Sequence, residues 1–242
     1  MKRTFLLICT WLFTVIVNAQ DHTLFMKKWM VQGADTIPYR LLLPLNYDAT
    51  KKYPLIFFLH GSGERGSDNE LQLVHGATLF EKEETRKDFP AIVVFPQCYK
   101  DGYWSNVLRT FDEDQHIHYN FIPAGNPTRA MELLQTLLTY IMQTYPVKKD
   151  QVYVGGLSMG GMGTYELVRR SPGIFAAAFP ICAGAVPSTA AAMKEVSWWV
   201  FHGGKDDVVA PVFAEKMVAA LKKEKASVKF TFYPEANQNN YH

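Results

Sequence analysis

"VYVGGLSMGG", residues 152–161, joins a short apolar run to a serine that has glycines on both sides. The apolar run has the composition of a buried strand, and a helical pattern follows to about Arg170. The form G-x-S-x-G at 156–160 therefore falls at a turn from strand to helix. At such a turn the hydroxyl projects above the sheet edge, and the helix N-terminus favours negative charge beside it. This setting predicts that Ser158 is a nucleophile; a glycine-rich turn with an incidental serine is the alternative.

Strand patterns alternate with helical patterns outward from this turn. Two N-terminal segments, 24–31 and 36–44, are expected to form an antiparallel pair. Apolar runs predict buried strands at 53–60, 91–97, 151–156 and 175–183, with further strands at 197–203 and 228–234 and helices at 128–145 and 211–223. This alternation predicts an α/β fold: a mostly parallel central sheet with helices on both faces, and an antiparallel strand pair at its N-terminal end.

The first 19 residues are typical of a secretory signal peptide. Lys2 and Arg3 precede an apolar stretch that ends at Val17, and Ala19 is the small residue expected before a cleavage site. The apolar stretch is short for a membrane-spanning helix, which is the alternative. We therefore expect cleavage after Ala19, export to the periplasm or the medium, and a single domain over residues 20–242.

Charge and cysteine content limit the partners and the covalent structure. The formal net charge is +2, and loss of Lys2 and Arg3 with the signal peptide brings it to zero. A neutral chain does not attract nucleic acid or anionic membranes by its overall charge. Export permits a disulfide between Cys98 and Cys182, but each cysteine follows a predicted central strand. Two buried thiols are therefore favoured over a disulfide.

A second segment, "HGSGERG" at 60–66, follows a predicted strand and can supply an oxyanion hole. Two backbone N–H groups stabilise the negative charge that acyl transfer builds on a carbonyl oxygen. The N–H of Met159 is one candidate donor, and that of Ser62 or Gly63 is the other. We expect His60 to pack beneath this loop rather than to act as a base.

A third segment, "FHGGKDDVVAP" at 201–211, places two acidic residues after a predicted strand. A carboxylate from Asp206 or Asp207 could orient an imidazole and stabilise its charged form. The alternative is a pair of solvated loop acids, with Asp207 capping a turn. His202, at the strand end, is expected to be structural.

The segment 100–127 shows no clear period and is expected to form a functional cover. Its aromatic residues Tyr103, Trp104 and Phe111 could form a platform for a sugar or phenolic group, or cover the core. His116 and His118 have the spacing of metal ligands on a strand, but no supporting cluster predicts a zinc site. We expect no metal and no cofactor.

Together these segments resemble the α/β-hydrolase superfamily, in particular its secreted esterase and peptidase branch related to polyhydroxybutyrate depolymerases, feruloyl esterases and acetylxylan esterases. The resemblance is carried by "LHGSGERGSDN", "VVFPQC", "YVGGLSMGGMGTYELVRRSP" and "WVFHGGKDDVV", and spans the chain from about Leu24. It implies Ser158 as nucleophile and Asp206 as the acid of a catalytic triad. It also implies cleavage of small-molecule or polysaccharide-linked carboxylic esters through an acyl-enzyme, with peptidase or thioesterase activity as the alternative.

The chain departs from this resemblance in its last loop, "YPEANQNNYH" at 233–242. Gln238 occupies the position where the family carries its histidine, and a glutamine amide cannot accept a proton at neutral pH. The chain also ends where the family usually continues into a closing helix, so the fold is expected to lack that helix. Three interpretations stay open: a fragment or an error in the last codons, replacement of the base by His242, or a binding protein on an inactive hydrolase scaffold.

Overall fold

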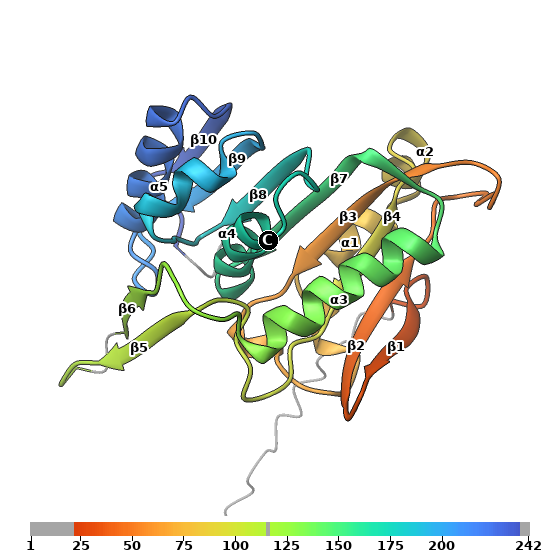
Figure 1. Ribbon diagram of the computed structural model, residues 1–242, viewed down its shortest axis with the longest axis horizontal. Helices are drawn as coiled ribbons and strands as arrows, with labels where there is room; N and C mark the ends of the chain where they lie inside the picture. Colours follow the sequence, from red (N-terminus) through yellow and green to blue (C-terminus); the bar gives the residue numbers. More distant parts are fainter. Residues whose placement is uncertain (1–21, 115–116, 238–242) are drawn as a thin grey trace, which may run out of the picture.

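The computed structural model describes residues 22–114 and 117–237, and its centre is an eight-stranded sheet (Figure 1). The strands, in spatial order, are β1 (Met26–Gln32), β2 (Asp35–Leu42), β4 (Ile92–Pro96), β3 (Tyr53–Leu59), β7 (Val147–Leu157), β8 (Ala177–Ile181), β9 (Ser197–Gly203) and β10 (Val228–Tyr233). β1 and β2 pair antiparallel, and β2 is antiparallel to β4. All other neighbours in the sheet are parallel. The predicted fold class and the N-terminal strand pair are therefore confirmed.

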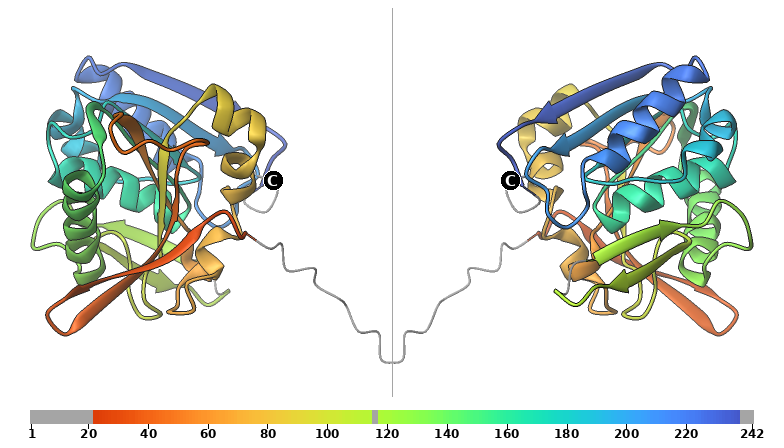
Figure 2. Two further views of the ribbon diagram at one scale, coloured as in Figure 1. Left: turned by 90° about the vertical axis from the view of Figure 1, so that its right-hand side faces the viewer. Right: turned by 90° about the vertical axis from the view of Figure 1, so that its left-hand side faces the viewer.

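Helices cover both faces of the sheet, as Figure 2 shows. The short helices α1 (Ala77–Glu81) and α2 (Glu83–Asp88) lie on one face. The other face carries α3 (Arg129–Thr144), α4 (Met159–Arg170) and α5 (Val212–Lys223). Three 3₁₀ helices complete the connections: η1 (Ser62–Glu64), η2 (Leu71–Leu73) and η3 (Pro187–Met193).

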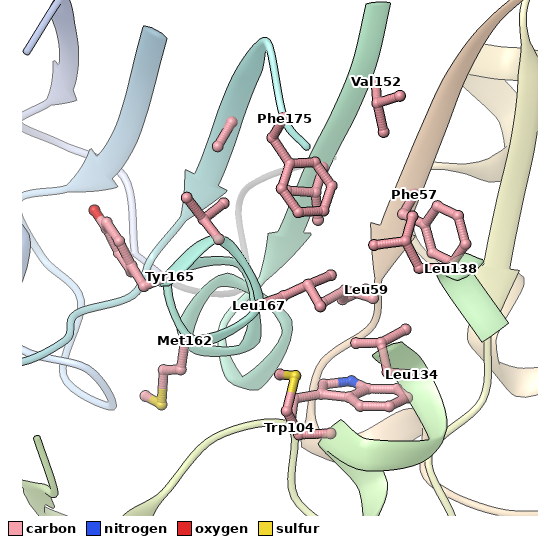
Figure 3. Close-up of a cluster of buried hydrophobic side chains, with 14 of the residues drawn as sticks. Phe57, Leu59, Trp104, Leu134, Leu138, Val152, Met162, Tyr165, Leu167 and Phe175 are labelled. Carbon is pink, nitrogen blue, oxygen red and sulfur yellow. The ribbon is translucent and has the colours of Figure 1, made fainter. Parts of the chain in front are cut away.

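The main core lies between the sheet and the helices α3 and α4 (Figure 3). Phe57 and Leu59 project from β3 toward this layer, and Leu134 meets them from α3. The first turn of α4 presses on the end of β3, because a Cβ on Gly160 would overlap Leu59. This close approach brings the start of α4 against the loop that follows β3.

The predicted cover at 100–127 contains a hairpin that the sequence pattern does not reveal. β5 (Val107–Phe111) and β6 (Ile117–Phe121) pair antiparallel and form a separate two-stranded sheet. β5 is exposed beyond Val107 and shows no alternation of apolar and polar residues, whereas β6 alternates between half-buried apolar and exposed polar residues over only five positions.

Several predictions fall outside the part of the chain that the structure describes. These are the signal peptide at 1–19, His116, Gln238 and His242. Within residues 22–114 and 117–237, no helix is long and apolar enough to cross a membrane.

Candidate active site

Ser158 stands at the junction of β7 and α4 in a backbone conformation that a serine rarely adopts. Its φ is 55° and its ψ is −115°, in the positive-φ region that costs an L-residue about 1–3 kcal/mol. The hydroxyl does not cap the helix that follows, although serine at a helix start commonly does so. The Ser158 N–H donates to Ile181 O at 2.9 Å, which ties this strained turn to the end of β8.

Two glycines allow this turn to lie against the end of β3. A Cβ on Gly156 would lie 2.6 Å from Leu59 O, and one on Gly160 would lie 2.7 Å from His60 O. Both distances are shorter than real Cβ contacts, so larger residues would push the turn away from the strand. The glycines of the G-x-S-x-G pattern are therefore required by close backbone approach on both sides of Ser158.

The loop after β3 borders Ser158. A Cβ built on Gly61 would lie 3.8 Å from the Ser158 Cβ, so the two residues are neighbours. Ser62 and Gly63 follow in η1, and Met159 begins α4. The N–H groups at the start of a helix have no partner within the helix and carry its positive dipole end. The structure thus brings the three predicted oxyanion donors to the same side of the sheet as Ser158.

His60 fixes this loop from below. Its Nδ1 donates to Gly61 O at 2.6 Å, and its Nε2 accepts from the Cys98 N–H at 2.9 Å. Burial lowers the pKa of His60 to about 4, so the imidazole is neutral at physiological pH. Both nitrogens are already engaged, which agrees with a structural role and leaves none to act on Ser158.

Asp206 has the environment that a triad acid requires. It is 5% exposed, and its Oδ1 accepts from Val208 N at 3.0 Å and from Val209 N at 2.8 Å. Its Oδ2 has no hydrogen-bond partner among the described residues. A buried carboxylate oxygen without a donor is costly, so this oxygen is prepared to receive one from a side chain or ligand.

Two neighbours of Asp206 have other roles. His202 is completely buried and its Nε2 donates to Val209 O at 2.8 Å, while the Asp206 Oδ2 lies 3.3 Å from the same nitrogen. His202 therefore supports the loop from inside the fold, as predicted. Asp207 is exposed and so lacks the enclosed setting of Asp206.

Among residues 22–114 and 117–237, the remaining histidines and cysteines form no metal cluster. His118 lies 3.0 Å from the Asp112 carboxylate on the exposed hairpin. Among the described residues, no three His, Cys, Asp or Glu side chains gather as a metal site. Cys98 and Cys182 are both buried and are not joined by a disulfide, and burial raises the pKa of the Cys98 thiol to about 12.

Of the two alternatives for the aromatic residues of the 100–127 segment, a platform or a cover of the core, Trp104 fits the second. This side chain is fully buried and packs edge-on against the His60 ring at 5.5 Å, as part of the core in Figure 3. Tyr103 is half-buried beneath the Arg109 guanidinium, and Phe111 is exposed on the hairpin.

A different aromatic cluster borders a groove between the hairpin and α5. Phe121 lies between Tyr119, with ring centroids 6.1 Å apart, and Phe213, at 5.4 Å. Phe121 and Phe213 line the groove, which has a volume of about 180 Å³. No local pattern predicts this cluster, because its members come from segments about 90 residues apart.

The comparisons with known proteins agree with the fold. The family described as "Putative esterase" matches residues 34–229, and the chain belongs to it. A thermostable esterase of known structure is 32% identical, with a TM-score of 0.77; the match covers 88% of this chain and 55% of that chain. The chain therefore spans about half the length of this relative.

Two feruloyl esterases share the fold at lower identity. One, from Anaeromyces mucronatus and solved with ferulic acid, is 17% identical with a TM-score of 0.63, over 88% of this chain and 84% of that chain. The other is a feruloyl esterase module from Clostridium thermocellum, complexed with sinapinate. It is 18% identical with a TM-score of 0.59, over 88% of this chain and 81% of that chain.

Proposed function

We propose that this chain is an exported serine hydrolase that cleaves carboxylic esters through an acyl-enzyme. The observation that carries the proposal is the strained backbone of Ser158 at the β7–α4 junction. Strain of this kind persists where function requires it, and here it presents a hydroxyl that does not cap its helix. Membership of an esterase family supports the same reaction.

The proposed reaction has two steps. Ser158 Oγ attacks the ester carbonyl carbon, the alcohol leaves with a proton, and an acyl-serine remains. Water then attacks that acyl group and releases the acid and the free serine. The N–H of Met159 and that of Ser62 or Gly63 stabilise the oxyanion in both steps. Asp206, through the Oδ2 that accepts no hydrogen bond from the described residues, orients and stabilises the protonated base.

We propose that the residue that acts as the base lies within residues 238–242. Gln238 stands at the expected histidine position, and His242 is four residues further on. The substrate is proposed to be a small or polysaccharide-linked ester. Peptidase or thioesterase activity would use the same nucleophile, and profiling with amide and thioester substrates distinguishes them.

The test is hydrolysis of p-nitrophenyl acetate by residues 20–242, beside Ser158→Ala, Gln238→His and His242→Asn. Hydrolysis that is lost in both Ser158→Ala and His242→Asn would identify His242 as the base. If the parent equals Ser158→Ala while Gln238→His gains at least about a hundredfold, the site is intact and lacks only its base.

A binding protein on an inactive hydrolase scaffold is the second candidate, and Gln238 is the observation that favours it. Absence of Ser158-dependent hydrolysis in every folded variant, Gln238→His included, would refute the esterase proposal and leave this candidate.

A further inference from the structure

A carboxylate lies beside Ser158 that the proposed reaction does not use. Glu64 closes η1, and its side chain is only 14% exposed. Its Oε2 lies 2.9 Å from the position that a Cβ would take on Gly61, and that position is 3.8 Å from the Ser158 Cβ. The two distances, 2.9 and 3.8 Å, place Oε2 within about 6.7 Å of the Ser158 Cβ.

The charge of this carboxylate is not neutralised by a lysine or arginine among the described residues. The ion-pair partner in reach is His75, whose Nε2 lies 3.7 Å from the Glu64 Oε1. Arg65, the next residue, donates its guanidinium N–H groups to Ser62 O at 2.9 Å and Gly102 O at 3.2 Å. Gln97 donates to the backbone oxygen of Glu64 and not to its carboxylate. Among the described residues Glu64 therefore has no lysine or arginine as an ion-pair partner, and its carboxylate lies close to the place where a substrate would meet Ser158.

A negative charge at this place does not assist the chemical step. The ester oxygen becomes negative in the transition state, and a carboxylate within about 7 Å raises the energy of that charge. The same field acts on a charged substrate: it attracts a cation near the reacting carbonyl and repels an anion. Partial burial strengthens this effect, because less water screens the interaction.

We infer that Glu64 is a specificity-determining residue of this site, selecting esters that carry a cationic group near the scissile bond over esters that carry an anionic one. His75 holds the carboxylate against the loop. This inference rests on the proposed function, since it concerns a substrate bound at Ser158.

The test uses three aryl acetates of different charge: phenyl acetate, which is neutral, 3-acetoxybenzoate, which is anionic, and 3-acetoxy-N,N,N-trimethylanilinium, which is cationic. The measured quantity is the ratio of kcat/KM for the cationic ester to that for the anionic ester at low salt. At about 7 Å, one negative charge is expected to raise kcat/KM for the cationic ester about tenfold and to lower kcat/KM for the anionic ester about tenfold. Glu64→Gln is therefore expected to lower the ratio about a hundredfold. Glu64→Asp keeps the charge and is expected to retain most of the ratio.

The matched control is Glu84→Gln, which removes the same charge from an exposed position on α2. Its ratio should stay within about twofold of the parent. Raising the salt concentration on the parent alone should also reduce the selectivity, which tests the charge effect even if Glu64→Gln fails to fold.

A second readout does not require turnover. Phenylboronic acid and 3-carboxyphenylboronic acid form adducts with an active serine, and calorimetry gives the ratio of their dissociation constants. Glu64→Gln should reduce the ratio of the dissociation constant of 3-carboxyphenylboronic acid to that of phenylboronic acid by about tenfold. Ser158-dependent hydrolysis with unchanged charge ratios would overturn this inference and leave the proposed function standing. Neither hydrolysis nor adduct formation at Ser158, in the parent and in Gln238→His alike, would overturn both.

Discussion

Gly160, in the first turn of α4, is the position where one methyl group should disturb both the fold and the site. A Cβ there would overlap the carbonyl carbon and oxygen of Leu59 and would lie 2.7 Å from His60 O. All three are backbone atoms at the end of β3, so no side-chain rotation can make room. Gly160→Ala must therefore separate the start of α4 from the oxyanion loop.

The magnitude follows from two opposing terms. Alanine is intrinsically favoured over glycine inside a helix by about 1 kcal/mol. Overpacking costs about 1–3 kcal/mol and occasionally more. Overlap of the new Cβ with backbone atoms should cost about 3 kcal/mol or more, because the backbone cannot rotate away as a side chain can. We expect a net loss of about 2 kcal/mol or more in the free energy of unfolding. In a domain of this size that loss lowers Tm by about 4–8 °C.

The assay is urea unfolding of the parent, Gly160→Ala and Gly63→Ala. Gly63→Ala is the matched control, because no atom lies within 4 Å of its added Cβ, and its stability should stay within about 0.5 kcal/mol of the parent. Ester hydrolysis should fall in Gly160→Ala even where the variant is fully folded, since the oxyanion loop has moved. A Gly160→Ala protein as stable as the parent would refute the close approach of helix and strand.

Three further predictions concern titratable groups. Asp206→Asn keeps an oxygen that accepts from the loop N–H groups but loses the negative charge. The value of kcat/KM for p-nitrophenyl acetate should therefore fall about 10²–10⁴-fold. Asp207→Asn, the control, should have the same kcat/KM as the parent. Burial raises the pKa of the Cys98 thiol to about 12. This thiol should therefore react with Ellman's reagent at pH 8 at least about a hundredfold more slowly in the folded chain than in urea. Equal rates would contradict its burial. The pKa of His60 is about 4 in the folded chain against an ordinary 6.5, so the unfolded chain takes up this proton first as the pH falls. About 3 kcal/mol of stability, fully present above pH 6.5, should therefore be lost between pH 6.5 and 4. His60→Asn should remove this pH dependence, whereas His118→Asn, at an exposed position, should keep it.

Much of the fold could be read from the chain because a parallel sheet is buried on both faces. β3, β4 and β8 are near-continuous apolar runs, and each lies within two residues of its predicted bounds. The hairpin β5–β6 was not predicted, because its strands are mostly exposed or half-buried and neither is a continuous apolar run. β6 alternates apolar and polar residues, but its partner β5 does not.

The candidate site divides in a similar way. Ser158 could be predicted because the strand, the turn and the helix that place it are consecutive in the chain. The glycines that flank it are also visible there, although the atoms that require them include the backbone of Leu59 and His60, far away in the sequence. Asp206 and Asp207 are adjacent in the sequence and both are acidic. From the sequence alone, only the resemblance to the hydrolase family favours Asp206 as the triad acid. Burial separates the two, since Asp206 is enclosed and Asp207 is exposed.

The sequence by itself determined the alternation of strands with helices and the serine at the turn after β7, because these patterns lie within short consecutive stretches of the chain. Only the tertiary structure decided which side chains from distant segments meet there. It buried Trp104 beneath α4, although an aromatic residue in a long polar segment has the composition of a surface platform. It also set the Glu64 carboxylate beside Ser158, 94 positions away in the chain. Such contacts depend on the closure of the β3 loop against the turn after β7, which no local pattern encodes.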